Sequence, residues 1–100
     1  MDQSVQTYLK PELDEASKEL LAMADKMERD GWCQYKVVDA HGRVCIVGSH
    51  IGYEYVEVMF RLRANLGVAS NGGVIDWNNA PGRTQAEVVA KLRSVALGGA

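Results

Sequence analysis

The run from Gly31 to Gly48, GWCQYKVVDAHGRVCIVG, constrains the fold more than any other part of the sequence, and it holds both cysteines. Two segments rich in residues that favour strands, 33–38 and 43–47, flank a turn with an acid at its start and a glycine at its end, Asp39-Ala40-His41-Gly42. We therefore predict a short antiparallel β-hairpin over these two segments. Because an isolated two-stranded hairpin is marginal in water, it must pack on helices.

Hydrophobic residues at three- and four-residue spacing predict three helices, at about 11–30, 50–66 and 84–97. The second predicted helix is apolar on more than one side, which indicates either a central helix or a contact with another chain. The last one opens with the residue pattern of a capping box, from Thr84 to Glu87. Ser49 is the predicted N-cap of the second helix.

Residues 74–80 fit either one or two helical turns or a short extended piece, and Pro81 prevents a helix from continuing smoothly through it. The predicted fold class is α+β and mostly α, with three main helices packed on one hairpin. Residues 11–98 are expected to form a single globular domain. Residues 1–10 are polar and lack a period, so we expect a flexible arm there.

The charge balance excludes one large class of partners. The chain has 100 residues with 13 acidic and 11 basic side chains interspersed, for a net charge of −2. Proteins that bind nucleic acids usually carry a basic stripe, so we expect no nucleic-acid partner. The apolar runs are far shorter than the ~20 residues of a membrane span, and no secretory signal begins the sequence. The expected location is the cytoplasm, where Cys33 and Cys45 would be thiols, although a disulfide between facing strands stays open.

Four residues have the chemistry of zinc ligands: Cys33, His41, Cys45 and His50. Their spacing contains neither a CxxC nor an HxxxH pair, so we predict no metal site. Cys45 lies in an apolar run that would raise its pKa and make the thiol inert. We predict no catalytic residues and no cofactor, and the balance favours a protein that is not an enzyme.

The stretch from Trp77 to Thr84, WNNAPGRT, has two interpretations. It could be an exposed loop at a helix N-terminus, where free N–H groups and Arg83 hold a carboxylate or phosphate. The second interpretation, which we favour, is a structural joint in which Arg83 pairs with an acid such as Asp76 or Glu87. The candidate binding residues are Trp77, Asn78, Asn79, Arg83 and Thr84, with Arg43 and Gln34 nearby.

Three motifs carry a family resemblance: GWCQ at 31–34, DAHGRVC at 39–45, and WNNAPGRT with a following Glu87-Val88 at 77–88. Over roughly residues 12–97 the chain resembles a family of small uncharacterised proteins of actinobacteria and their phages. That family has the pattern WND-x-PGRT, and Asn79 replaces its acid here. The resemblance implies a cytosolic accessory protein, and it transfers no functional residue.

Two functions fit these observations. The first is a non-enzymatic protein that binds a host protein or a second copy of itself through apolar and aromatic surface. The alternative is a small-molecule or anion-binding domain that uses the Trp77–Thr84 loop and the helix start. A pocket beside Trp77 with convergent polar groups would favour the alternative.

Overall fold

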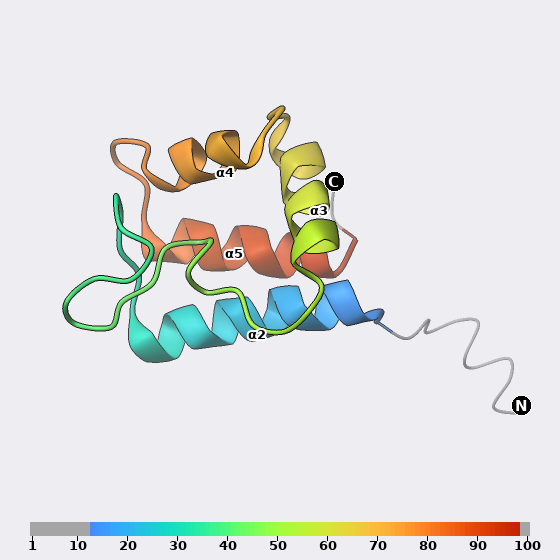
Figure 1. Ribbon diagram of the computed structural model, residues 1–100, viewed down its shortest axis with the longest axis horizontal. Coiled ribbons are helices and arrows are strands. Elements are labelled where there is room, and N and C mark those ends of the chain that lie inside the picture. The colour runs from blue at the N-terminus through green and yellow to red at the C-terminus, as the bar shows by residue number, and fades with distance from the viewer. Residues whose placement is uncertain (1–12, 99–100) are drawn as a thin grey trace, which may run out of the picture.

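The computed structural model describes residues 13–98, and these residues form four helices (Figure 1). In chain order the helices are α2 (Glu15–Asp30), α3 (Tyr55–Leu66), α4 (Asn71–Asn78) and α5 (Gln85–Ala96). A long irregular segment connects α2 to α3, whereas the other connections are short. The predicted arm at residues 1–10 lies outside the described residues.

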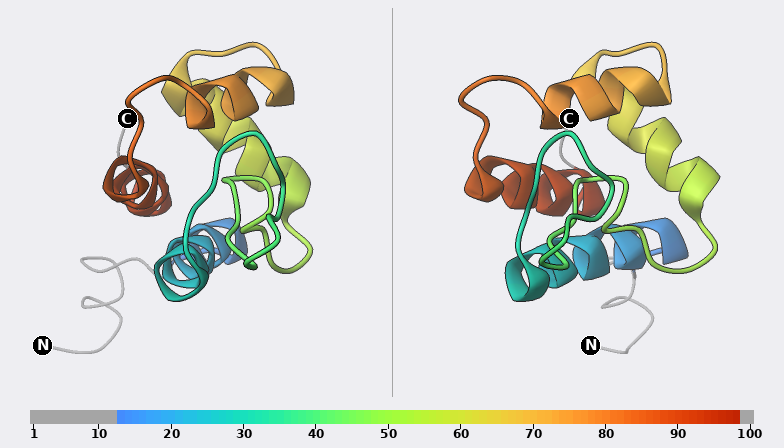
Figure 2. Two further views of the ribbon diagram at one scale, coloured as in Figure 1. Left: turned by 90° about the vertical axis from the view of Figure 1, so that its left-hand side faces the viewer. Right: turned by 60° about the vertical axis from the view of Figure 1, so that its left-hand side comes forward.

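Helices α2 and α5 lie side by side, and α3 and α4 close the other sides of the core (Figures 1 and 2). Each helix turns an apolar stripe inward, as its three- and four-residue spacing requires. The irregular segment between α2 and α3 contributes Val44 and Ile46 to the same core. The side chains with 0% exposure include Leu20, Met23, Met27, Ile46, Val58, Leu62, Val74, Val88 and Leu92.

Helix α5 begins where the sequence predicts it. The Thr84 hydroxyl accepts a hydrogen bond from the Glu87 backbone N–H at 3.2 Å, and the Glu87 carboxylate accepts one from the Thr84 backbone N–H at 3.1 Å. This reciprocal arrangement is the predicted capping box, and it satisfies donors that an N-terminus otherwise leaves free.

Helix α3 starts later than predicted, at Tyr55, and Ser49 is not its N-cap. The Ser49 hydroxyl is fully buried and donates to the Ile46 carbonyl oxygen at 2.7 Å, so it closes a local turn. The start of α3 has no cap from its own side chains. Instead, the Glu19 carboxylate of α2 accepts a hydrogen bond from the Glu54 N–H at 3.0 Å, which also places negative charge at the positive end of the helix dipole.

The ambiguous stretch at 74–80 belongs to a helix that begins earlier than the pattern suggests. Ser70 caps α4 by accepting a hydrogen bond from the Gly73 N–H at 3.2 Å. Helix α4 then ends at Asn78, before Pro81. Two glycines in its first turn lower its helix propensity, so its sequence does not predict a helix there. The stability of α4 therefore depends on its cap and on packing.

The prediction of an α+β fold is wrong, because residues 13–98 contain four helices and no strand. The segments 33–38 and 43–47 do not form a hairpin ladder. Only Val44 forms bridges, to Trp32 on one side and to Val38 on the other. The predicted turn itself is present, since the Asp39 carboxylate accepts hydrogen bonds from the His41 and Arg43 N–H groups at 2.9 and 3.0 Å.

The physical reason for the missing hairpin is that several backbone groups of the two segments bond to partners outside the hairpin: the Val44 N–H donates to the Gly31 carbonyl oxygen at 2.9 Å, and other N–H groups donate to the end of α4. The Ile46 N–H donates to the Asn78 side chain at 3.0 Å, and the Tyr35 N–H donates to the Asn79 side chain at 2.9 Å. Strand pairing competes with any other good acceptor for each backbone donor. Here the acceptors are the last residue of α4 and its C-cap, both more than thirty residues away along the chain.

An ion pair joins the first turn of α2 to α3. The Arg61 guanidinium contacts the Asp14 carboxylate at 2.6 Å and the Glu57 carboxylate at 2.9 Å. The hydrogen bond from Arg61 lowers the pKa of Asp14 far below its ordinary value of 3.8, and bonds from Ser17 add to this shift. Asp14 is also the N-cap of α2, because it accepts a hydrogen bond from the Ser17 N–H.

We expect Asp14→Asn to lower the melting temperature at neutral pH. Asparagine is an equally good N-cap, so the change removes mainly the charge that Arg61 contacts. Because folding lowers the pKa of Asp14, its stabilisation is complete above about pH 4 and is lost as the pH falls below that value. Thermal melts from pH 7 to pH 2 should therefore show the difference between wild type and variant shrinking. A difference that stays constant over this range would contradict the assignment.

Candidate functional site

The side chain of Asn78 is fully buried at the end of α4 and connects three distant parts of the chain. Its Oδ1 accepts hydrogen bonds from the Trp32 indole N–H at 2.8 Å and from the Ile46 backbone N–H at 3.0 Å. Its Nδ2 donates to the Cys33 carbonyl oxygen at 3.2 Å. Both ends of this amide are thus satisfied by the irregular segment, as a buried polar group requires.

Gln34 and Asn79 extend this network toward the surface. The Gln34 amide nitrogen donates to the backbone oxygens of Asn78 and Ala80, both at 3.1 Å. The Asn79 side-chain oxygen accepts from the Tyr35 N–H at 2.9 Å and from the Asn78 amide at 3.0 Å. We call the set Trp32, Gln34, Tyr35, Asn78 and Asn79 the amide joint.

Tyr35 is held in a strained backbone conformation within the amide joint. Its φ angle is +68°, and no other described residue apart from glycines has a positive φ. The residue is 74% exposed, and its hydroxyl donates to the Asn79 carbonyl oxygen at 3.3 Å. A left-handed conformation costs a side chain such as tyrosine roughly 1–2 kcal/mol. The amide joint therefore holds an aromatic ring at the surface at a cost in folding free energy. Strained backbone conformations of this kind cluster at functional sites.

Arg83 is bound to its neighbours in sequence and does not point freely into solvent. Its Nε donates to the Trp77 carbonyl oxygen at 2.9 Å, and its guanidinium carbon lies 4.1 Å from the centre of the Trp77 ring. A second guanidinium nitrogen contacts the Glu87 carboxylate at 3.0 Å. Hydrogen bonds from Thr84, and then from Arg83, hold the pKa of Glu87 below its usual range. A carboxylate of the chain itself therefore occupies the start of α5.

The structure divides the seven predicted binding residues between separate places. Trp77 and Arg83 line an open groove of about 480 Å³ along α5, with Lys91 and Ser94 further along it. Gln34 and Arg43 line a different open groove, also of about 480 Å³, beside the Asp39 turn. Asn78 is buried, Asn79 lies in the amide joint, and Thr84 is used as a cap.

The two cysteines are buried and free. The Cys33 thiol lies 3.3 Å from the backbone oxygens of Lys36 and Arg43, and burial raises its pKa. Within residues 13–98, no group of three or more Cys, His, Asp or Glu side chains is arranged to hold a metal ion. Over the same residues, no helix is long and apolar enough to cross a membrane.

Sequence reasoning missed the contributions of Trp32 and Tyr35. Tyr35 lies in the predicted strand 33–38 and Trp32 just before it, where the composition favours a strand. The partners of these residues are 44 to 46 positions away along the chain, so no local pattern connects them. The one available signal was that two of the motifs that carry the resemblance are those at 31–34 and 77–83. Motifs that occur together can be in contact in the fold, which would have suggested this pairing.

We expect Asn78→Ala to lower the free energy of unfolding by about 3 kcal/mol or more, because it leaves the Ile46 N–H and the Trp32 indole without their buried acceptor. Chemical denaturation measures this change. The matched control is Asn79→Ala, which removes a half-buried amide next to it and should cost about 1 kcal/mol. Equal losses for the two variants would show that Asn78 does not hold the segment in place.

Tyr35→Asn is expected to raise the free energy of unfolding by about 0.5–1 kcal/mol, because asparagine tolerates a positive φ better than tyrosine does. The hydrogen bond lost from the tyrosine hydroxyl is exposed and contributes little. Urea denaturation of the two proteins gives the difference. A clearly less stable variant would mean that the ring itself stabilises the fold.

Comparison with known proteins places the chain in one family. Neither the curated proteins nor the solved structures contain a match to it. The model of DUF6197, a family of unknown function, matches residues 11–97, which is nearly the whole sequence. All of the amide joint, the capped start of α5 and the four helices lie within the matched range. The chain therefore belongs to the DUF6197 family.

Proposed function

We propose that this chain is a non-enzymatic accessory protein of the bacterial cytoplasm, encoded by an actinobacterium or its phage, that acts by binding another protein. The observation that carries the proposal is the surface of α3. Three residues of this helix are exposed, and all three are apolar: Val56, Phe60 and Ala64. They follow one another at four-residue spacing, so they form a single ridge along the helix, which we call the α3 ridge.

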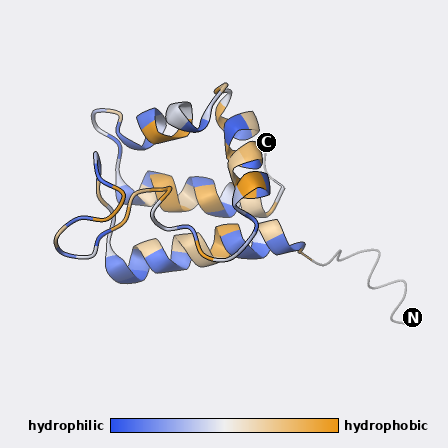
Figure 3. Cartoon of the chain, in the orientation of Figure 1, coloured by the Kyte–Doolittle hydropathy of each residue, from blue (hydrophilic) through white to orange (hydrophobic). Residues whose placement is uncertain are grey.

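The longest helix among the described residues, α2, shows what an ordinary solvated face looks like in this chain. Its exposed residues are all charged: Glu15, Lys18, Asp25, Glu28 and Arg29. In Figure 3 α2 is hydrophilic over much of its length, whereas hydrophobic and hydrophilic residues alternate along α3. Charged residues also exist on α3, but Glu57 and Arg61 are half-buried in an ion pair beside the ridge.

The exposure of the α3 ridge is large. Val56 is 79% exposed and Phe60 57%, and Tyr53, just before the helix, is 99% exposed. Leaving such side chains in water forgoes the favourable free energy of burying them. A contiguous exposed apolar surface on a small domain commonly marks a site where another protein binds.

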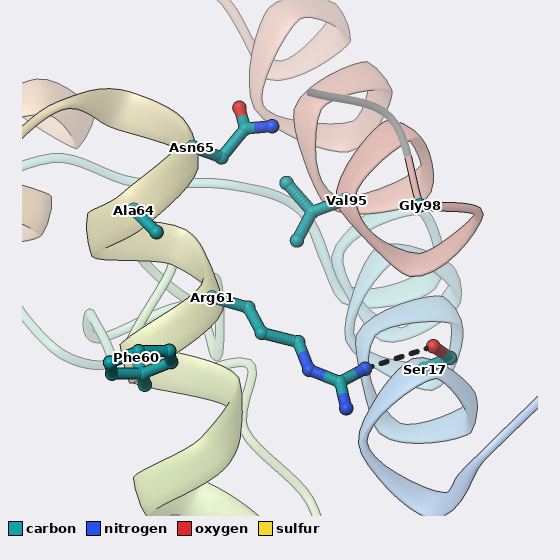
Figure 4. Close-up of a pocket in the computed structure, with 7 residues that line it drawn as sticks. All are labelled: Ser17, Phe60, Arg61, Ala64, Asn65, Val95 and Gly98. Atoms are coloured by element: carbon teal, nitrogen blue, oxygen red, sulfur yellow. Dashed lines mark hydrogen bonds between the residues drawn. The ribbon is translucent and has the colours of Figure 1, made fainter.

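The ridge borders an open groove of about 650 Å³ between α2, α3 and α5 (Figure 4). Phe60 and Ala64 belong to both the ridge and the groove, and Val95 of α5 contributes a further apolar side chain. Arg61 reaches across from α3, and its guanidinium donates to the Ser17 hydroxyl at 3.2 Å. The ridge and the groove together offer a partner an apolar surface with two cations beside it, since the Arg63 guanidinium also lies 5.9 Å from the centre of the Phe60 ring.

The alternative function, anion binding at the Trp77–Thr84 loop, has less support. Glu87 occupies the start of α5, and the ion pair with Glu87 and the Trp77 ring engage Arg83. An added anion would have to displace this carboxylate. The groove beside Trp77 is the observation in favour of the alternative, and variants in that groove can test it.

We expect Phe60→Glu to abolish capture of a partner while the protein stays folded, because it places a charge at the centre of the apolar ridge. The measurement is a pull-down with the tagged full chain from a lysate of the cell that encodes it, with melting temperatures recorded in parallel. Ser94→Glu introduces the same charge at an exposed position of α5 and is the matched control. Its binding should equal that of wild type.

Two other outcomes would redirect the proposal. If Ser94→Glu abolishes capture and Phe60→Glu does not, the binding surface is the groove beside Trp77, which Ser94 lines. If neither variant alters capture and Tyr35→Asn does, the amide joint presents the contact residue. No stoichiometric partner for wild type over a range of salt concentrations would contradict the proposed function unless the chain binds itself.

A further inference from the structure

The surface of α3 is complementary to a reversed copy of itself. Along the ridge and its continuation at both ends, the residues before Phe60 are larger than those after it: Tyr53 and Val56 precede it, and Ala64 and Gly67 follow it. A second copy that crosses α3 in the antiparallel direction, with Phe60 at the centre, would place large residues opposite small ones. Val56 of each copy would then lie over Ala64 of the other, and Tyr53 over Gly67.

The space that this arrangement requires is present. Gly67 ends α3 in the left-handed conformation, and nothing lies within 4 Å of the position where a Cβ atom would be. Ala64 is exposed and lines the open groove, and its own side chain is only a methyl group, so it leaves room for a larger side chain from outside. Tyr53 is 99% exposed and has no hydrogen bond among the described residues, so it is available for a contact outside its own chain.

The charges beside the ridge also suit the reversed direction. On one flank an acid, Glu57, is followed one helical turn later by a base, Arg61. When two helices pair in antiparallel fashion, the same flanks of both helices meet, and the order of their charges is reversed. Glu57 of one copy would therefore approach Arg61 of the other. The Glu57 side chain is 46% exposed although it already contacts Arg61 of its own chain, so it can accept a further hydrogen bond.

From this self-complementarity, and resting on the proposed function, we propose that the partner of the α3 ridge is a second copy of this chain. The two copies pair through antiparallel α3 helices around a twofold axis near Phe60. Such an interface is isologous, because each contact between two different residues occurs twice and the assembly closes at two copies. Phe60 of each copy would extend the apolar wall of the groove on the other.

The area of the α3 ridge determines how tight a dimer we expect. Helix α3 has 12 residues, which corresponds to a length of about 18 Å. Stable interfaces of standard size bury about 800 Å² on each partner, and a ridge of this length with Tyr53 offers less than that. We therefore expect a reversible dimer with a dissociation constant in the micromolar range.

The test is sedimentation equilibrium of the purified full chain from low micromolar to submillimolar concentration. Wild type should show a monomer–dimer equilibrium, and Phe60→Glu should raise the dissociation constant at least about tenfold. Ser94→Glu, which lies on another helix face, should leave it unchanged. Circular dichroism melts of each variant show whether it is folded.

A size substitution separates this specific pairing from general adhesion of apolar surfaces. Ala64→Leu makes the ridge more apolar, so non-specific association would become stronger. In the antiparallel pair it would instead clash with Val56 of the other copy and weaken the dimer at least about tenfold. The double variant Val56→Ala with Ala64→Leu restores the match of large with small and should recover much of the affinity.

The outcomes distinguish this inference from the proposed function. A chain that stays monomeric at every concentration, or a dimer that Ala64→Leu strengthens, would overturn the antiparallel pairing. If the chain is monomeric and Phe60→Glu still abolishes capture of a different protein, the proposed function stands and only the identity of the partner is wrong. If the chain is monomeric and captures nothing, both are wrong.

Discussion

The buried amide of Asn78 is the interaction on which the arrangement of the irregular segment depends. The segment from Gly31 to Glu54 has neither a helix nor a ladder to satisfy its backbone groups. Asn78 supplies an acceptor and a donor at one point, and Gln34 and Asn79 supply more around it. With that point fixed, Val44 and Ile46 enter the core between the helices. An amide can do this because it is neutral, so its burial costs far less than that of a charge.

The same joint explains how two motifs of this sequence relate to one another. The motif at 31–34 and the motif at 77–83 are far apart in sequence, yet Trp32 and Gln34 of the first contact Asn78 and Ala80 of the second. Arg83 then continues the second motif into the capped start of α5 through Trp77 and Glu87. The most distinctive residues of the chain are thus largely engaged with one another. The surface that they leave unexplained is the apolar side of α3, which is why the functional proposal rests there.

Two features of this small domain are costly for stability, and both place apolar or aromatic groups in water. Tyr35 adopts a positive φ that glycine or asparagine would adopt more readily. The α3 ridge exposes Val56 and Phe60 where α2 exposes only charged residues. A folding requirement alone explains neither feature, because polar residues at these positions would suit water better. A contact with another protein, including a second copy, would bury such groups and recover that free energy.

The sequence by itself determined the helices with strong local signals. The capping box at Thr84 and Glu87 marked the start of α5, and apolar spacing identified the inward faces of α2, α3 and α5, because these signals act within one or two turns. Only the tertiary structure decided the region from Gly31 to Glu54. Its β-favouring composition predicted a hairpin, but Asn78 and Asn79 provided acceptors from another helix, and the ladder did not form. Strand propensity depends only on residues that are close in sequence, so it does not include a hydrogen-bond partner more than thirty residues away. The free energy of a buried hydrogen bond is larger than the small preference of these residues for a strand.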